Sequence, residues 1–340
     1  MAILDTMLGR RLATHEEEGQ RVGVTAGIPL LGLDALASSA YGPEAALTIL
    51  IPLGVLGLGY IVPISGLIVA LLLIVFVSYR QTIAAYPNGG GSYTVAQENL
   101  GQGAGLLAAA ALMLDYVLVV AVGISAGVGA LVSALPVLQP YILPLCLAVL
   151  ALMTLINLRG VRESGLAFML PTYLFVVALF GMLAVGFAKL LLGDGVPVPV
   201  VAPPAAPAAT GNVSLWLLVG AFASGCTAMT GVEAVSNGVA AFRAPSVRYA
   251  RRTLTAIVAI LALLLLGIAW LGRSYGVVAT EPGTAGYESV LSQLIGAIIG
   301  KGVGYYVTIA AVLMVLALSA NTGLAGRPRR AICCSTAWVR

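Results

Sequence analysis

The sequence predicts an all-helical protein that crosses a membrane several times, and three observations lead to that fold class. Hydrophobic residues make up 60% of the 340 residues and charged residues only 9%, whereas about 25% of an ordinary soluble domain is charged. Eight nearly uncharged runs are long enough to cross a bilayer core of about 30 Å as helices. Two of these runs are interrupted by helix-breaking residues. Lipid is therefore expected to surround most of the chain.

The eight runs are bounded by polar or turn-forming residues. They cover residues 22–52, 55–78, 103–134, 141–158, 166–192, 213–241, 253–271 and 303–323. The chain accordingly divides into a cytoplasmic N-terminus (1–21), five spans (22–192), an extracytoplasmic Pro/Ala loop (193–212), three further spans (213–325) and a basic tail (326–340). The prolines of the loop disfavour a helix there.

The basic residues predict that both termini are cytoplasmic. Of the 17 Lys and Arg residues, all but Lys189, Arg273 and Lys301 fall on the side of the N-terminus when the eight spans are traced in order. Because Lys and Arg of short loops are retained in the cytoplasm, we expect a multi-pass protein of the plasma membrane. With 13 acidic residues as well, the charges are too few and too scattered for a nucleic-acid-binding face.

The first span is interrupted near its middle by Gly42-Pro43, which two serines precede. Pro43 cannot donate a backbone hydrogen bond and disfavours the helical conformation at Gly42. We therefore expect the backbone to open there. Carbonyls freed in a membrane are tolerated only where they line a cavity or are buried in protein.

The sixth span has a comparable weak point, where Gly225 and Gly231 bracket Thr227 and Thr230 directly before Glu233. A face of small residues that packs against another helix would explain the glycines but not the glutamate. Breaks in the first and sixth spans are what an inverted repeat of five spans predicts, with both breaks meeting at the bilayer centre around a substrate.

Four acidic residues lie within the predicted spans, where a carboxylate is costly. They are Asp34, Glu44, Asp115 and Glu233. No Lys or Arg lies at comparable depth, so these acids are either protonated or face a mobile cation. Glu44 is nearer the outer end of its span and could equally be hydrated.

The residue types around the breaks favour a cation over an amino acid as the substrate. Monovalent cations need several oxygen ligands, and the hydroxyls of Ser38, Tyr41, Tyr116 and Thr230 add to the carboxylates. The carboxylate of an amino acid would be repelled by three nearby acids, although an amino acid permease remains the alternative. An enzyme is disfavoured because the spans contain no His and no nucleophile with a base partner. No cofactor is predicted.

Several motifs resemble a known family. The run YPNGGGSY at 86–93 resembles the Pro-x-Gly-Gly-x-Tyr loop of the amino acid-polyamine-organocation (APC) superfamily. Residues 32–44, 115–116 and 230–238 are similar to potassium uptake proteins of the KimA kind, relatives of the proton-coupled KUP importers. The resemblance covers about residues 15–325.

The resemblance implies a LeuT-type fold with broken helices 1 and 6, a homodimer, and 10 to 12 spans, of which about eight are present. It implies potassium and H+ as the transported ions. The residues that match the family's potassium site are Asp34, Tyr41, Asp115, Tyr116, Thr230 and Glu233. Ser38, Glu44 and Thr227 are secondary candidates, and Asp34 and Glu233 are candidates for carrying the coupling proton.

The C-terminal tail departs from the family pattern. Residues 317–322 fit it, but 327–335 bring a run of arginines and two cysteines. We hypothesise a frameshifted or truncated gene model, which would make this polypeptide an inactive membrane fragment by itself. The alternative is a genuine basic tail that lies on anionic lipid.

Overall fold

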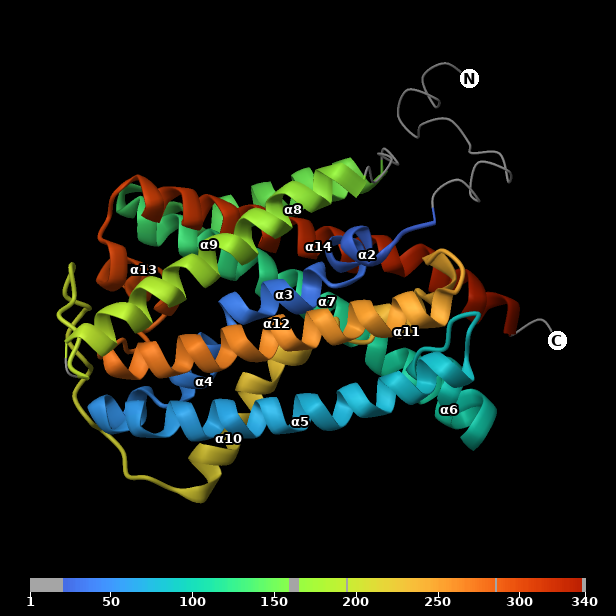
Figure 1. Ribbon diagram of the computed structural model, residues 1–340, viewed down its shortest axis with the longest axis horizontal. Coiled ribbons are helices and arrows are strands. Elements are labelled where there is room, and N and C mark those ends of the chain that lie inside the picture. The colour runs from blue at the N-terminus through green and yellow to red at the C-terminus, as the bar shows by residue number, and fades with distance from the viewer. Residues whose placement is uncertain (1–20, 159–164, 194, 285, 338–340) are drawn as a thin grey trace, which may run out of the picture.

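The computed structural model describes residues 21–158, 165–193, 195–284 and 286–337, with side chains up to 320 except in 156–167. Within these residues the regular structure is helical, apart from one isolated parallel bridge between Val22 and Phe242. Figure 1 shows long helices running alongside one another, with both ends of the described chain at the same end of the molecule. The predicted all-helical class is confirmed. The side chains of the tail at 326–340, and residues 1–20, lie outside the described part.

The helices are joined mostly by short connections. In chain order they are α2 (Val24–Leu31), α3 (Leu33–Ala37), η3 (Ser38–Ala40), α4 (Gly42–Ile49), η4 (Ile51–Gly57), α5 (Leu58–Ala85), α6 (Ser92–Leu100), α7 (Gln102–Ala134), η5 (Pro136–Tyr141), α8 (Ile142–Leu158), α9 (Gly165–Leu192), α10 (Leu215–Gly225), η6 (Cys226–Met229), α11 (Ala234–Asn237), η7 (Val239–Ala241), α12 (Ser246–Ser274), α13 (Val290–Ile299) and α14 (Val303–Ala337).

Seven helical segments in the described chain are long and apolar enough to cross a membrane. Together with the interrupted first span, formed by α2, α3, η3 and α4, they correspond to the eight predicted spans. α5 ends at Ala85 rather than at 78, and α12 begins at Ser246 rather than at 253. The difference arises because arginines continue both helices beyond their apolar runs. The length of an apolar run is set by the thickness of the membrane core, whereas the helix can extend beyond it.

The centre of the molecule is occupied by α12, which packs against α5, α2, α9 and α3. In its most apolar stretch, 56% of the residues are buried, whereas none of those in the corresponding stretch of α8 is. α14 packs against α7 and α9, and α10 packs against α4. Spans from before and after the Pro/Ala loop therefore share one core.

One helix of the structure is missing from the sequence prediction. α13 has ten residues, and all from Val290 to Ile298 are buried. A helix of this length rises about 15 Å, which is half of the bilayer core. α13 is therefore too short to count among the runs of spanning length.

Charged side chains of earlier spans hold both ends of α13. At its N-terminus, Glu44 of α4 accepts hydrogen bonds from the Val290 N–H at 3.1 Å and the Tyr287 hydroxyl at 2.7 Å. At its C-terminus, Lys189 of α9 donates to the Ile298 carbonyl at 2.6 Å. An acidic side chain at the N-terminus and a lysine at the C-terminus suit the dipole of α13. Burial, and then the Glu44 charge, raise the pKa of Tyr287, so its hydroxyl stays protonated and donates. Both oxygens of Glu44 thus have protein partners.

The Pro/Ala loop between α9 and α10 contains no helix in its described residues, as its prolines predict. The Val200 N–H donates to the Ala297 carbonyl at 2.8 Å, and the N–H groups of Thr210 and Gly211 donate to the Pro52 carbonyl at 3.0 Å. The loop therefore connects the C-terminal end of α13 with the end of the first span.

Candidate functional site

The first span opens where the sequence predicts, over Ser38–Tyr41. The segment forms a turn of 3-10 helix, and Pro43 then lies in the first turn of α4, where a missing N–H costs nothing. The hydroxyls of Ser38 and Ser39 donate to the carbonyls of Ala35 and Leu36 at 2.7 Å. These bonds replace part of the interrupted helical ladder.

The sixth span opens over Cys226–Glu233, also as predicted. α10 ends at Gly225, Thr230 is extended with ψ 150°, and Gly231 has φ 76°. The Thr227 hydroxyl donates to the Ser224 carbonyl at 2.8 Å, and the Thr230 hydroxyl donates to the Thr227 carbonyl at 3.1 Å. The backbone between α10 and α11 therefore leaves the α-helical conformation, with the 3-10 helix η6 followed by a turn over 230–233.

The two breaks lie directly against each other. The Ser38 hydroxyl is within hydrogen-bond distance of the Ala228 carbonyl, and the Tyr41 hydroxyl lies 3.1 Å from the Thr230 hydroxyl oxygen. A Cβ added at Gly231 would lie 2.6 to 2.8 Å from atoms of the Asp34 side chain. The meeting of the two breaks that the sequence predicts is therefore present in the structure.

Three of the four acids gather around this junction. Asp34 in α3, Asp115 in α7 and Glu233 before α11 lie close enough for their charges to interact with one another. All three are partly buried. Glu44 lies elsewhere, at the N-terminus of α13.

Hydroxyl and amide groups surround two of these carboxylates. The Ser319 hydroxyl of α14 donates to Oδ1 of Asp34 at 2.7 Å. Glu233 accepts at Oε2 from the Ser92 hydroxyl at 3.0 Å, and at Oε1 from the Tyr116 hydroxyl and the Asn237 amide, both at 3.4 Å. Five elements, α3, α6, α7, α11 and α14, therefore supply the oxygen-rich site.

Three of these partners were not among the predicted site residues: Ser92, Asn237 and Ser319. Ser92 follows the glycine run of the 86–93 loop, and that loop reaches the site because the Gly90 N–H donates to the Ser236 carbonyl at 3.1 Å. A Cβ at Gly91 would collide with the Asn237 side chain. The glycines thus permit close packing of the loop on the sixth span. The glycine run directly before Ser92 is the sequence signal that could have identified this serine.

Lys301 and Glu288 form an ion pair in the described part of the chain, and this pair lies away from the breaks. In the same part of the chain, no three His, Cys, Asp or Glu side chains lie close enough to ligate one ion together. A cation bound here would therefore need hydroxyl or carbonyl oxygens besides a carboxylate.

Comparisons with known proteins agree with this architecture. Residues 34–331 match the family model described as amino acid permease. Over 329 residues the chain is 40% identical to the potassium transporter KimA of Bacillus subtilis, in an alignment that covers 96% of this chain and 52% of that protein. The chain spans about half the length of this relative. The resemblance inferred from the motifs is confirmed.

Proposed function

From the premise that the chain belongs to the amino acid permease family, we propose that it is a secondary active membrane transporter and that potassium is its cargo. The observation that carries this proposal is the meeting of the two broken spans, where the Tyr41 hydroxyl lies 3.1 Å from that of Thr230 and Asp34 lies against Gly231. Three carboxylates with hydroxyl neighbours offer a cation both charge and oxygen ligands. KimA, the relative with 40% identity, is a potassium transporter.

The hydroxyl positions suggest which residues contact the ion. The oxygens of Tyr41 and Thr230 lie 3.1 Å apart, and Asp34 borders Gly231 next to Thr230. Asp115 and Tyr116 approach from α7, and Tyr116 bonds Glu233. A dehydrated potassium ion would exchange its water oxygens for these groups.

Proton coupling is part of the proposal. An acid that alternates between a protonated state and a cation-paired state links the two fluxes. Asp34 and Glu233 are the candidates, because each belongs to a broken span whose backbone can rearrange. The proposed orientation places the N-terminus in the cytoplasm, on the side of most arginines.

Rubidium uptake into a bacterium that lacks its own potassium uptake systems tests the proposal. Cells that express the chain should take up rubidium and grow at low potassium, and Asp34→Asn should abolish both. Glu98→Gln, which removes an exposed carboxylate of α6, is the matched control and should leave uptake unchanged. Rubidium uptake that survives Asp34→Asn would contradict the proposal. So would a lack of rubidium uptake by the wild-type chain when it is present in the membrane.

An amino acid substrate is the second candidate, and the description of the matching family favours it. The site argues against it, because Asp34, Asp115 and Glu233 would repel the carboxylate of an amino acid. An excess of unlabelled amino acids should leave rubidium uptake unchanged. Radiolabelled amino acid uptake that depends on Asp34, without rubidium uptake, would favour the second candidate.

A further inference from the structure

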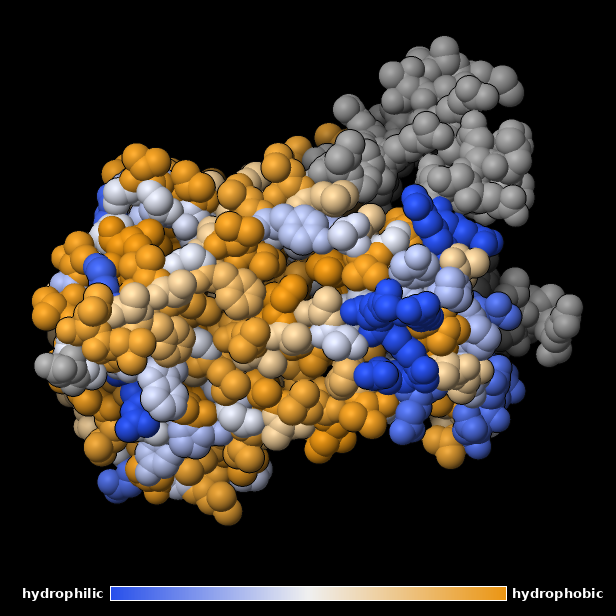
Figure 2. Space-filling view, viewed as in Figure 1, coloured by the Kyte–Doolittle hydropathy of each residue, from blue (hydrophilic) through white to orange (hydrophobic). Residues whose placement is uncertain are grey.

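Exposed arginines gather where the inner ends of α5 and α12 meet. Arg80 lies in the last turns of α5, Arg243 in the connection before α12, and Arg248 and Arg252 in the first turns of α12. The Nε of Arg251 donates to the Arg80 carbonyl at 3.0 Å and thereby joins the two helix ends. Figure 2 shows a strongly hydrophilic patch at this end of a largely hydrophobic face.

The helix end that carries this patch adds to its positive charge. The first turn of α12 contains no acidic residue, and its N-cap, Pro245, supplies no capping side chain. The N-terminus of a helix adds about half a positive charge of its own. Among the described residues, the ion pair of Lys301 with Glu288 lies near α13, at the opposite end of α12. The patch thus suits an anionic ligand.

An apolar stripe leads away from these arginines along α12. Its exposed residues recur every three or four positions, so they share one helix face. After Arg248 and Arg252 they are Thr255, Ala259, Leu263, Leu266 and Trp270. Leu263 is 58% exposed and Trp270 is 52% exposed.

The length of the stripe matches a membrane core. Trp270 follows Arg252 by 18 positions, a rise of about 27 Å along the helix, close to the hydrocarbon thickness of about 30 Å. Tryptophan favours the membrane–water interface, so Arg252 lies at headgroup depth on the other side. On α5, Ile74 and Val77 are 68% and 53% exposed within two turns of Arg80, so this arginine too is followed by exposed apolar residues.

We propose that this surface is a binding site for an anionic phospholipid. The phosphate contacts Arg248 and Arg252, with Arg80 and Arg243 beside it, and the acyl chains lie along the exposed stripe of α12. The continuity of the arginines with a stripe at membrane depth favours a lipid over an acidic soluble protein. That the lipid belongs to the cytoplasmic leaflet follows from the proposed orientation of the chain. The binding of the lipid does not depend on that orientation.

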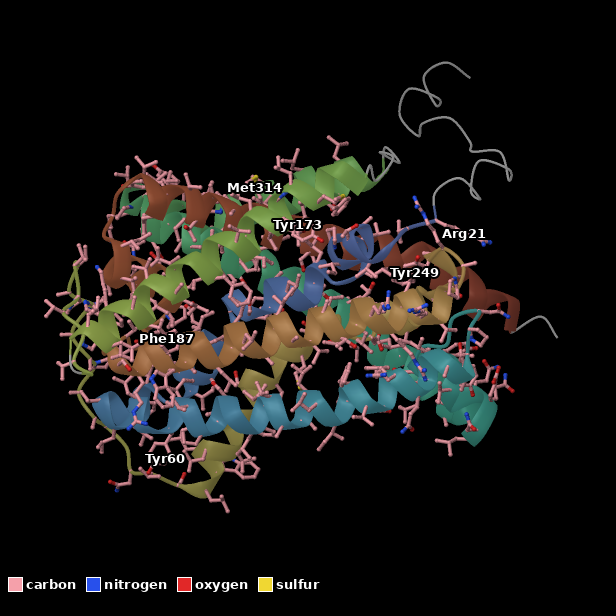
Figure 3. All side chains as sticks on the ribbon, in the orientation of Figure 1. Arg21, Tyr60, Tyr173, Phe187, Tyr249 and Met314 are labelled. Atoms are coloured by element: carbon pink, nitrogen blue, oxygen red, sulfur yellow. The ribbon has the colours of Figure 1, made fainter. Side chains whose placement is uncertain are left out.

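The site is also linked to the broken helices. The Arg243 N–H donates to the Val22 carbonyl at 3.1 Å, and the Val22 N–H donates to the Ala241 carbonyl at 2.9 Å. The Arg243 Nε donates to the Arg21 carbonyl at 2.8 Å. Figure 3 shows Arg21 and Tyr249 together at this end of the molecule. A lipid bound beside Arg243 would therefore lie next to the point where the inner ends of the first and sixth spans are joined.

Native mass spectrometry of the purified chain in detergent tests the site. Phosphatidylglycerol should be retained in preference to phosphatidylcholine with the same acyl chains. Arg248→Gln/Arg252→Gln should weaken phosphatidylglycerol retention by about tenfold. Arg273→Gln, which removes an arginine at the other end of α12, should retain it like the wild type.

Further arms separate the alternatives. High salt should reduce phosphatidylglycerol retention by the wild type, which keeps the test decisive if the double variant does not fold. Glycerol phosphate should not compete. The proposal is overturned by equal retention of both lipids, by unchanged retention in a folded double variant, by competition from glycerol phosphate, or by binding of polyglutamate in place of the lipid. None of these outcomes depends on transport activity.

Discussion

The contact between Asp34 and Gly231 limits which residues the sixth-span break accepts. Gly231 has φ 76°, a left-handed conformation that strains any residue with a Cβ. A Cβ there would also lie 2.6 Å from Oδ2 of Asp34. Glycine thus permits both the turn of the backbone and the close approach of the carboxylate.

Gly231→Ala should therefore reduce both stability and uptake. The left-handed conformation alone costs an alanine about 1–2 kcal/mol, and Asp34 must also move. We expect a lower melting temperature in detergent and a loss of rubidium uptake at unchanged expression. Gly66→Ala is the control, since nothing lies within 4 Å of the added Cβ. A Gly231→Ala protein that transports normally would refute this account of the break.

The hydroxyl of Ser319 makes a second contact at the site that mutation can test. It donates to Oδ1 of Asp34 at 2.7 Å, and a hydrogen bond to a charged group contributes about 1.5–3 kcal/mol. Ser319→Ala should lower the kcat/KM of rubidium uptake by about tenfold. Ser125→Ala is the control, because the Ser125 hydroxyl bonds only carbonyls of its own helix. Equal kinetics for both variants would exclude a role for Ser319 in positioning Asp34.

The sequence could predict the acids of the site but not their partners. Asp34, Asp115 and Glu233 stand out because a carboxylate in an apolar run needs a compensating function. Ser92 and Ser319 do not stand out, because serine is common at helix ends and helix packing faces alike. Their bonds to Glu233 and Asp34 join residues 141 and 285 positions apart. Only the packing of α6 and α14 against the broken spans creates these bonds.

At the scale of elements, the structure adds a buried helix to the predicted spans. The long spans were predictable because each repeats the hydrophobic thickness of a membrane. α13 carries the same apolar residues over too short a length, and its position depends on Glu44 and Lys189 from distant spans. α13 therefore closes the space between the first and fifth spans through polar bonds at its ends.

Glu44→Ala should loosen α13 without unfolding the molecule. The Val290 N–H and the Tyr287 hydroxyl would lose their acceptor, at a cost of about 1–3 kcal/mol. Hydrogen exchange of residues 286–300 should become faster, while exchange in α12 stays unchanged. Thr48→Val removes a hydroxyl that bonds only the carbonyl of Glu44, and serves as the control. Unchanged exchange in Glu44→Ala would show that apolar packing alone holds α13.

At the scale of the whole molecule, the spans on either side of the Pro/Ala loop interlock. α12 lies among α2, α3, α5 and α9, and α14 packs against α7 and α9. The predicted division into five and three spans therefore describes the order of the chain rather than separate bodies. Hydropathy reveals where helices cross the membrane, but the choice of neighbours depends on side-chain fit, which no single span encodes.

The Pro/Ala loop need not be an unbroken peptide for the molecule to stay assembled. Between the backbone bonds of Val200 and Thr210, the peptide chain contributes little more than Ala206 to the core. The core that the two sides share should therefore hold them together without an intact loop. A protease site inserted between Pro203 and Pro204 should thus be cleavable in the purified protein. The two pieces should comigrate and melt in a single transition. Separation of the pieces after cleavage would mean that the loop, not the core, maintains the assembly.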